Sequence, residues 1–214
     1  MTVRCVLPLV LVVATWIAPA AAQTVTVGAG VHQNIQRFDG DPALNRLDGQ
    51  SSGWSVLGGT RLGHWVIRAE ASRDATIRHT DAASLLVGTR PVTIHSELSH
   101  DMRDVAVLGG YAVDLTRRAE VTILGGTTTV SVHRAFTTDA GQQVLIPPSM
   151  VPPAAVTTTF DDRFTTWTVE GDGLVRVSSR LGVIGGVRVH RISLSEDISG
   201  LSVRPFVGGV WRLR

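Results

Sequence analysis

The sequence predicts an all-β protein that folds as a closed, antiparallel, up-and-down barrel of eight strands. Three observations lead to this prediction. Apolar and polar residues alternate with period two over eight runs, which is the pattern of strands with one apolar face. The connections between the runs are alternately long and short. Pairs of glycines recur near the centres of the runs, which indicates a sharply curved sheet.

The eight runs account for most of the chain beyond residue 23. They cover residues 24–36, 54–62, 65–78, 104–113, 119–133, 164–177, 181–190 and 203–214. An even number of runs suits a closed up-and-down sheet. The connections are long after the first, third, fifth and seventh runs and short after the others. Transmembrane barrels have this asymmetry, with long loops outside and tight turns on the periplasmic side.

The first three runs are justified by their alternation. The first run has mainly apolar residues at the odd positions from Val25 to Ile35, and polar residues or glycine at the even positions. Residues 38–53 are polar and contain Asp-Gly steps, so we expect a loop there. The runs at 54–62 and 65–78 alternate on either side of Gly63-His64, which predicts a hairpin with a tight turn.

The later runs are separated by two long connections. Residues 79–91 are predicted to form a loop, and residues 92–102 form an ambiguous extended segment. The run at 104–113 alternates strongly, whereas the alternation of the run at 119–133 slips around Gly125-Gly126, as a β-bulge would produce. Residues 136–162 contain two Pro-Pro pairs and form the longest irregular stretch. The run at 164–177 is the least regular, and the last two runs alternate without interruption.

An apolar residue followed by two glycines recurs along the chain. The copies are Leu57-Gly58-Gly59, Leu108-Gly109-Gly110, Leu124-Gly125-Gly126, Ile184-Gly185-Gly186 and Val207-Gly208-Gly209. Glycine weakens an isolated strand, so its repeated use at strand centres needs a reason. Turn glycines of an ordinary β-sandwich are one alternative, but those would lie at strand ends. A narrow barrel, where the backbone bends and interior side chains need room, is favoured.

The N-terminal residues have the pattern of a secretory signal. Arg4 precedes an apolar run from Cys5 to Ala18, and small residues follow before Gln23. We therefore expect residues 1–22 to be a cleaved signal peptide and residues 23–214 to be the outer-membrane β-barrel domain; an uncleaved membrane anchor is the alternative. Removal of Arg4 changes the net charge from +2 to about +1, which is not the balance of a nucleic-acid-binding protein. The mature chain has no cysteine, because Cys5 is the only one.

The two faces of the runs carry different residues. Large amphipathic aromatic residues lie on the apolar face near the ends of the runs, and we expect them to form aromatic girdles at the two membrane boundaries: Trp54, Trp65, Tyr111, Trp167 and Trp211. The polar face combines small residues with sparse charges, which we expect to pair as a charge network in the lumen: Arg61, Arg68, Glu70, Asp104, Glu120, Arg188 and His190. A transmembrane barrel is therefore favoured over a soluble one.

These features resemble a known family. The leader, the glycine-rich strands and the closing segment at 203–212 are similar to the small outer-membrane β-barrel proteins, the group of the OmpA transmembrane domain, OmpX and opacity-type proteins. The resemblance implies an eight-stranded barrel in the bacterial outer membrane with both termini in the periplasm. It also implies contact with outer-membrane lipid, lipopolysaccharide and the barrel insertion machinery. Members usually end in an aromatic residue, whereas this chain ends Trp211-Arg212-Leu213-Arg214.

No segment has the spacing that catalysis or metal binding requires. His95-Ser96-Glu97 and His100-Asp101 lie close together, but neighbours on a strand point to opposite faces. The histidines show no metal-ligand spacing, and strand rather than helix follows each Gly-Gly pair, so neither a metal nor a phosphate-binding loop is expected. We predict no enzymatic activity and no cofactor.

The sequence thus favours a non-enzymatic integral outer-membrane β-barrel protein of a Gram-negative envelope. Its expected role is envelope structure or surface interaction through long extracellular loops, above all residues 136–162, with a surface ligand that the sequence does not identify and with no nucleic acid as partner. One alternative is a soluble exported lipocalin-like barrel that binds a ligand. A lipid-modifying barrel enzyme is a second and less favoured alternative.

Overall fold

The structure is a computed structural model that describes residues 23–39, 49–87, 90–139, 155–193 and 199–213. The expected signal peptide at residues 1–22 lies outside these residues, as does the centre of the expected loop at 136–162. The described chain forms nine strands, and no helix in it is long and apolar enough to cross a membrane. The strands are β1 (Gln23–Asp39), β2 (Gly49–Leu62), β3 (Trp65–Asp74), β4 (Ile77–Val87), β5 (Arg90–Asp114), β6 (Ala119–Asp139), β7 (Val156–Arg176), β8 (Leu181–Ser193) and β9 (Ser199–Leu213).

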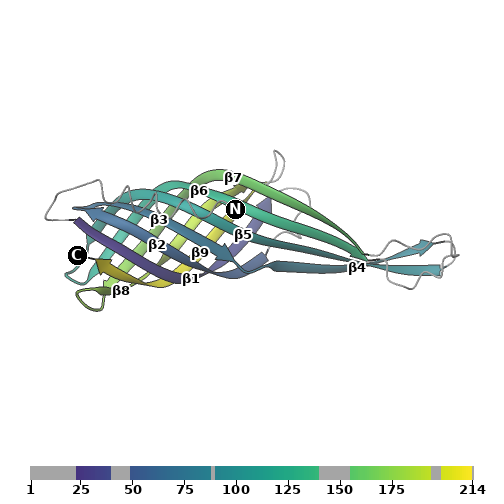
Figure 1. Cartoon of the computed structure of the whole chain (residues 1–214), viewed down its shortest axis with the longest axis horizontal. Helices are drawn as coiled ribbons and strands as arrows, with labels where there is room; N and C mark the ends of the chain where they lie inside the picture. The colour runs from purple at the N-terminus through teal and green to yellow at the C-terminus, as the bar shows by residue number, and fades with distance from the viewer. Residues whose placement is uncertain (1–22, 40–48, 88–89, 140–154, 194–198, 214) are drawn as a thin grey trace.

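Eight of the nine strands close into a barrel (Figure 1). The strands pair antiparallel in the order β3-β2-β1-β9-β8-β7-β6-β5, and an additional pairing of β3 with β5 closes the ring. The ninth strand, β4, lies outside the ring and pairs with residues 90–100 of β5. The predicted eight-stranded antiparallel up-and-down barrel is therefore confirmed.

The strands cross the barrel obliquely, as their register shows. The register can be followed once round the ring from Arg103 through Arg73, Trp54, Val31, Val207, Gly185, Gly173 and Val121 to Val113. The path returns to β5 ten positions from its start. A stagger of this kind tilts every strand relative to the barrel axis, which Figure 1 shows.

One end of the barrel carries the short turns and both described chain ends. Residues 63–64, 115–118 and 177–180 form the turns, and Val25 of β1 is the register partner of Leu213 of β9. Gly63 supports the first turn with a φ of 61°, a backbone conformation that glycine adopts without steric cost. We call this end the turn end, and the opposite end, from which β4, β5, β6 and β7 extend beyond the ring, the extension end (Figure 1).

The extension corrects two predicted loops. Residues 77–87 and 90–102 pair as a hairpin of β4 and β5 instead of forming a loop and an ambiguous segment. In the predicted irregular stretch at 136–162, residues 136–139 and 156–162 are strand, because β6 continues to Asp139 and β7 begins at Val156. The described side chains on both faces of these segments are mostly exposed or half-buried. They therefore lack the period-two alternation from which strands are recognised.

The predicted bulge at Gly125-Gly126 is wrong. The register of β6 runs without interruption through both glycines, on the β5 side and on the β7 side. The apolar residues change face instead: Ile123 points outward, whereas Val130 and Val132 point inward and pack with Met102. The slip in the sequence pattern marks the height at which the apolar face of the strand changes from outside to inside.

Candidate functional site: an apolar outer face around a charged interior

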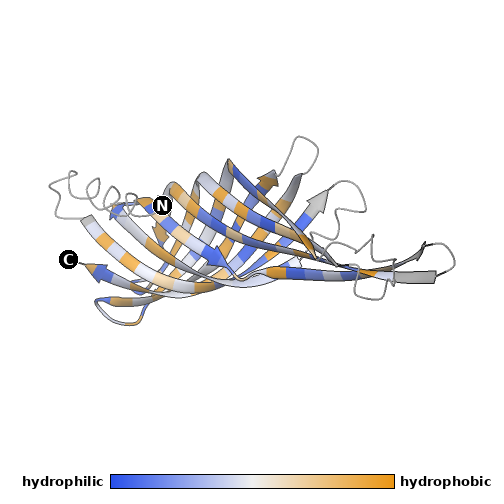
Figure 2. Cartoon of the chain, turned by 45° about the vertical axis from the view of Figure 1, so that its right-hand side comes forward, coloured by the Kyte–Doolittle hydropathy of each residue, from blue (hydrophilic) through white to orange (hydrophobic). Residues whose placement is uncertain are grey.

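The outer face of the ring is apolar on all eight strands. Side chains alternate sharply in exposure: Ile123 is 66% exposed, whereas its neighbour Leu124 is 1% exposed. The exposed apolar side chains form a continuous belt that we call the apolar belt: Val27, Val31, Trp54, Val56, Trp65, Ile67, Val105, Val107, Tyr111, Val113, Val121, Ile123, Trp167, Val169, Val175, Leu181, Val183, Val187, Val207, Trp211 and Leu213. Figure 2 shows the hydrophobic and hydrophilic residues alternating along the ring strands.

The five aromatic residues expected in girdles all lie on this outer face and are exposed. Trp65 and Tyr111 are register partners on β3 and β5 near the turn end, with ring centroids 5.7 Å apart in an edge-to-face contact. Trp211 lies near the same end of β9, opposite Val27. Trp54 lies in the half of β2 toward the extension end, and Trp167 lies directly beyond Thr168, where the pairing of β7 with β8 ends. The aromatic rings therefore mark both margins of the apolar belt.

The interior of the ring holds buried charges. Carboxylates and guanidinium groups from six strands point into it: Arg68, Glu70, Asp74, Asp104, Glu120, Glu170, Asp172, Arg188 and Arg204. A buried ion that lacks a partner is costly, so these groups must neutralise one another. They do so in three clusters stacked along the barrel axis.

The central cluster joins opposite walls of the barrel. Arg68 of β3 donates to Glu170 and, at 2.7 Å, to Asp172, both on β7. Arg188 of β8 donates through Nε to the same Glu170 at 2.7 Å and through Nη2 to Glu70 at 2.7 Å. Since β3 and β7 are not neighbours in the ring, this cluster spans the lumen.

The upper cluster lies toward the extension end and is centred on Asp74. Its carboxylate accepts a hydrogen bond from Asn34 Nδ2 at 2.5 Å and lies 2.6 Å from His32 Nε2. Arg204 lies 2.6 Å from Asp104 and 3.6 Å from Asp74. The cluster ties β1, β3, β5 and β9 together from inside the barrel.

The lower cluster lies at the turn end. Arg61 pairs with Asp114 at 2.7 Å and with Glu120, and Arg176 contacts the same two carboxylates at 3.1 Å and 3.0 Å. Two arginines thus share two carboxylates beside the short turns.

The seven charged residues selected from the sequence all face the interior: Arg61, Arg68, Glu70, Asp104, Glu120, Arg188 and His190. His190 is buried, and neither ring nitrogen has a hydrogen-bond partner in the described structure. Sequence reasoning missed Asp74, Glu170, Asp172 and Arg204. The signal was present for the β7 pair, because Glu170 and Asp172 alternate with the outward-facing Val169 and Trp167.

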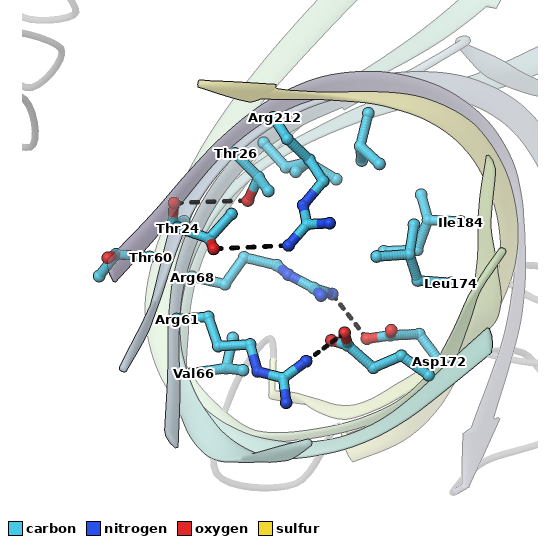
Figure 3. Close-up of a pocket in the computed structure, with 14 residues that line it drawn as sticks. Thr24, Thr26, Thr60, Arg61, Val66, Arg68, Asp172, Leu174, Ile184 and Arg212 are labelled. Carbon is cyan, nitrogen blue, oxygen red and sulfur yellow. Dashed lines mark hydrogen bonds and ion pairs between the residues drawn. The ribbon is translucent and has the colours of Figure 1, made fainter. Parts of the chain in front are cut away.

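A small cavity lies between the central and lower clusters (Figure 3). It measures about 40 Å³, which is room for water rather than for an organic ligand. Arg61, Arg68 and Arg212 point into it with Asp172, and Thr24 accepts a hydrogen bond from Arg212 at 3.4 Å. In the part of the chain that the structure describes, no group of three histidine, cysteine or carboxylate side chains is placed to hold a metal ion.

The chain was compared with known proteins. No protein-family model matches it. No curated protein matches it either. Among solved structures, Ail, the attachment invasion locus protein of Yersinia pestis, is 9% identical with a TM-score of 0.48 over 89% of this chain and 98% of Ail. Neisserial surface protein A is 10% identical with a TM-score of 0.44 over 92% and 99%. The outer membrane protein OprG from Pseudomonas aeruginosa is 8% identical with a TM-score of 0.47 over 90% and 97%.

Proposed function

We propose that the protein is an integral outer-membrane β-barrel without a catalytic site, which contributes to the envelope and presents its extension to the cell exterior. The observation that carries this proposal is the inverted distribution of polarity. Apolar side chains cover the outside of all eight ring strands, whereas ionised side chains fill the inside. Lipid is the solvent that suits such a surface.

The same distribution argues against a soluble ligand-binding barrel. A soluble barrel would turn its apolar residues toward the cavity, but here Arg68, Glu170 and Arg188 lie there. Exposed apolar patches on soluble monomers rarely exceed a few hundred Å², and the apolar belt surrounds the whole ring. The closed ring also leaves no strand edge unpaired within it, which a membrane barrel requires.

The proposed orientation follows from the two ends of the barrel. Outer-membrane barrels have short turns in the periplasm and longer segments outside. The turn end therefore faces the periplasm, and β4 with the upper parts of β5, β6 and β7 projects from the cell surface. The extension is a four-stranded sheet rather than a set of irregular loops, so a surface partner would meet a defined sheet.

Cell fractionation tests the proposal, together with a pair of variants at Gly109. Gly109 points outward within the apolar belt, and a Cβ there would have only the carbonyl oxygen of Val66 nearby, at 3.9 Å. Gly109→Arg places a charge in lipid, which costs about 2–4 kcal/mol at the bilayer midplane. Gly109→Ala is the matched control without a charge.

The wild type and Gly109→Ala should sediment with outer membranes, need detergent for extraction and migrate on gels in a heat-modifiable way. Gly109→Arg should give much less folded, membrane-embedded protein. Recovery of the wild type in the soluble periplasmic fraction would refute the proposal. Equal amounts of folded barrel for both variants would show that the outer face does not contact lipid.

A further inference from the structure

Five arginines point outward at the extension end of the apolar belt. They are Arg37 on β1, Arg73 on β3, Arg103 on β5, Arg163 on β7 and Arg191 on β8, and all five are exposed. We call them the arginine ring. They lie on five different strands of the ring, on the same face as the apolar belt and directly above it.

The strand register places these arginines side by side. Arg73 is the direct partner of Arg103, and Arg103 and Arg163 both face Ser131 of β6 from either side. On the other side of the barrel, Arg37 and Arg191 both face Leu201 of β9. The arginine ring therefore consists of one row of three and one row of two.

The two rows lie at the same height. One circuit of the register shifts the chain by ten positions, so residues at one level are offset by about 1.25 positions from strand to strand. When this offset between strands is taken into account, the levels of the five arginines along the barrel differ by no more than about four residue positions. Trp54 and Trp167 lie at the lower margin of that band, which places the arginine ring at the boundary of the belt.

Few ion pairs compensate the charge of the arginine ring in the part of the chain that the structure describes. Like charges opposite each other on a sheet are destabilising. Asp101 lies near the row of three, at 3.8 Å from Arg103 and 4.0 Å from Arg73, and the neighbouring Asp161 pairs with His133. Among the side chains that the structure describes, none forms an ion pair with Arg37, Arg163 or Arg191. The interior arginines differ: Arg188 has carboxylate oxygens at 2.5 Å and 2.7 Å.

We propose that the arginine ring binds the phosphate groups of anionic lipids in the outer leaflet. A guanidinium group donates two parallel hydrogen bonds to a phosphate, and arginine is the preferred residue for such forked contacts. The inference rests on the proposed function, because it requires lipid around the belt. A lipid places its phosphate directly above its acyl chains, and the arginine ring lies directly above the apolar belt, so a lipid fits both surfaces at once.

The test compares two triple variants with the same change in charge. The ring variant is R37Q/R163Q/R191Q, which removes the three arginines that form no ion pair with the described side chains. The control variant is R117Q/R118Q/R180Q, which removes three exposed arginines from the turns at the opposite end. The folded proteins are purified in a non-ionic detergent, and binding of a diphosphorylated lipopolysaccharide in mixed micelles is measured by titration. Inorganic phosphate serves as the lipid-free probe.

The wild type and the control variant should bind the glycolipid equally well. The ring variant should bind about fivefold more weakly per arginine removed, or roughly a hundredfold in total. Equal affinity of the ring variant and the wild type would overturn the proposal, as would an equal loss in the control variant. Full competition by inorganic phosphate would overturn the assignment to lipid.

Failure of the arginine-ring proposal can be distinguished from failure of the proposed membrane-barrel function. Heat-modifiable migration and membrane insertion report the barrel itself, and both variants should retain them, because glutamine at a water boundary does not oppose insertion. A barrel that inserts but does not distinguish the two variants in glycolipid binding refutes the arginine ring alone. A wild type that needs no detergent to stay soluble refutes the proposed function as well.

Discussion

At the scale of single residues, the interior is organised by shared partners. Glu170 accepts from Arg68 and Arg188, which come from different walls of the barrel. Removal of Glu170 therefore takes one partner from each of two buried arginines, and breaking a buried pair costs more than the pair contributes to net stability. The central cluster therefore stabilises the barrel only when all of its charged side chains are present.

Glu170→Gln should lower the free energy of unfolding by about 3–5 kcal/mol, because it removes one of the two carboxylates that compensate each of the buried guanidinium groups of Arg68 and Arg188. Urea-induced unfolding of the barrel in lipid vesicles measures this change. Glu97→Gln is the control, since Glu97 is 46% exposed in its side chain and lies 3.8 Å from Arg78; a loss below about 0.5 kcal/mol is expected there. Equal losses in the two variants would contradict the shared-partner interpretation.

A second prediction concerns His133, which lies outside the apolar belt toward the extension end. The hydrogen bond with Asp161 at 2.7 Å is the main cause that raises the pKa of His133 above its ordinary value of 6.5. The protonated pair stabilises the fold below pH 6.5, and this contribution fades as the pH rises through the raised pKa. In an NMR titration, Asp161→Asn should return the pKa of His133 toward 6.5. An unchanged pKa would show that Asp161 is not the cause.

The sequence could predict which charged side chains point into the barrel, but it could not predict which of them form ion pairs with one another. The alternation of apolar and polar positions along β3 and β8 was enough to predict that Arg68, Glu70 and Arg188 face inward. The partner Glu170 lies 102 positions from Arg68, across a closed ring whose register no local pattern defines. Pairing across a lumen depends on strand number and stagger together.

At the scale of the strand, the Gly-Gly pairs have two different causes. Gly109 faces outward, where a Cβ would meet only the carbonyl oxygen of Val66 at 3.9 Å. Gly110 faces inward, where a Cβ would overlap the carbonyl oxygen of Ile123 on β6 and lie 2.8 Å from the Leu124 Cα. The second glycine of the pair therefore permits close approach of β5 and β6, which is the curvature that a narrow ring needs.

Gly110→Ala should destabilise the barrel by about 1–3 kcal/mol, because the added methyl group forces the two strands apart. Gly109→Ala should change stability by less than about 0.5 kcal/mol. Urea unfolding in vesicles of one lipid composition compares them. If both variants lose the same stability, the pair serves the flexibility of the strand rather than the close approach of its neighbour.

The strands of the ring were predictable from sequence because lipid or water on one side and a packed interior on the other impose alternation. The upper parts of β5, β6 and β7 have water on both sides, so this constraint is absent there. Threonine is frequent in them instead: Thr137 and Thr157 face each other across β6 and β7 with their hydroxyls 2.9 Å apart. Threonine favours strands, but without an apolar face it gave no periodic signal.

At the scale of the whole molecule, eight strands enclose an interior that side chains fill. The central cluster links β3, β7 and β8 through the axis of the barrel. Vesicles that contain the protein should therefore admit arabinose no faster than empty vesicles in a swelling assay. A porin with a wide lumen, reconstituted at the same density, is the positive control. Swelling above the rate of empty vesicles would show that the clusters leave an open path.

The junction between the ring and the extension has a further consequence. The pairing of β7 with β8 ends at Thr168, so the segment from Val156 to Trp167 is bonded on the β6 side alone within the described structure. Its other edge presents N–H and C=O groups that water can satisfy and hydrocarbon cannot. The depth at which this barrel sits in a bilayer is therefore limited by its main chain: hydrocarbon can rise along the wall only as far as the last closed ring of hydrogen bonds.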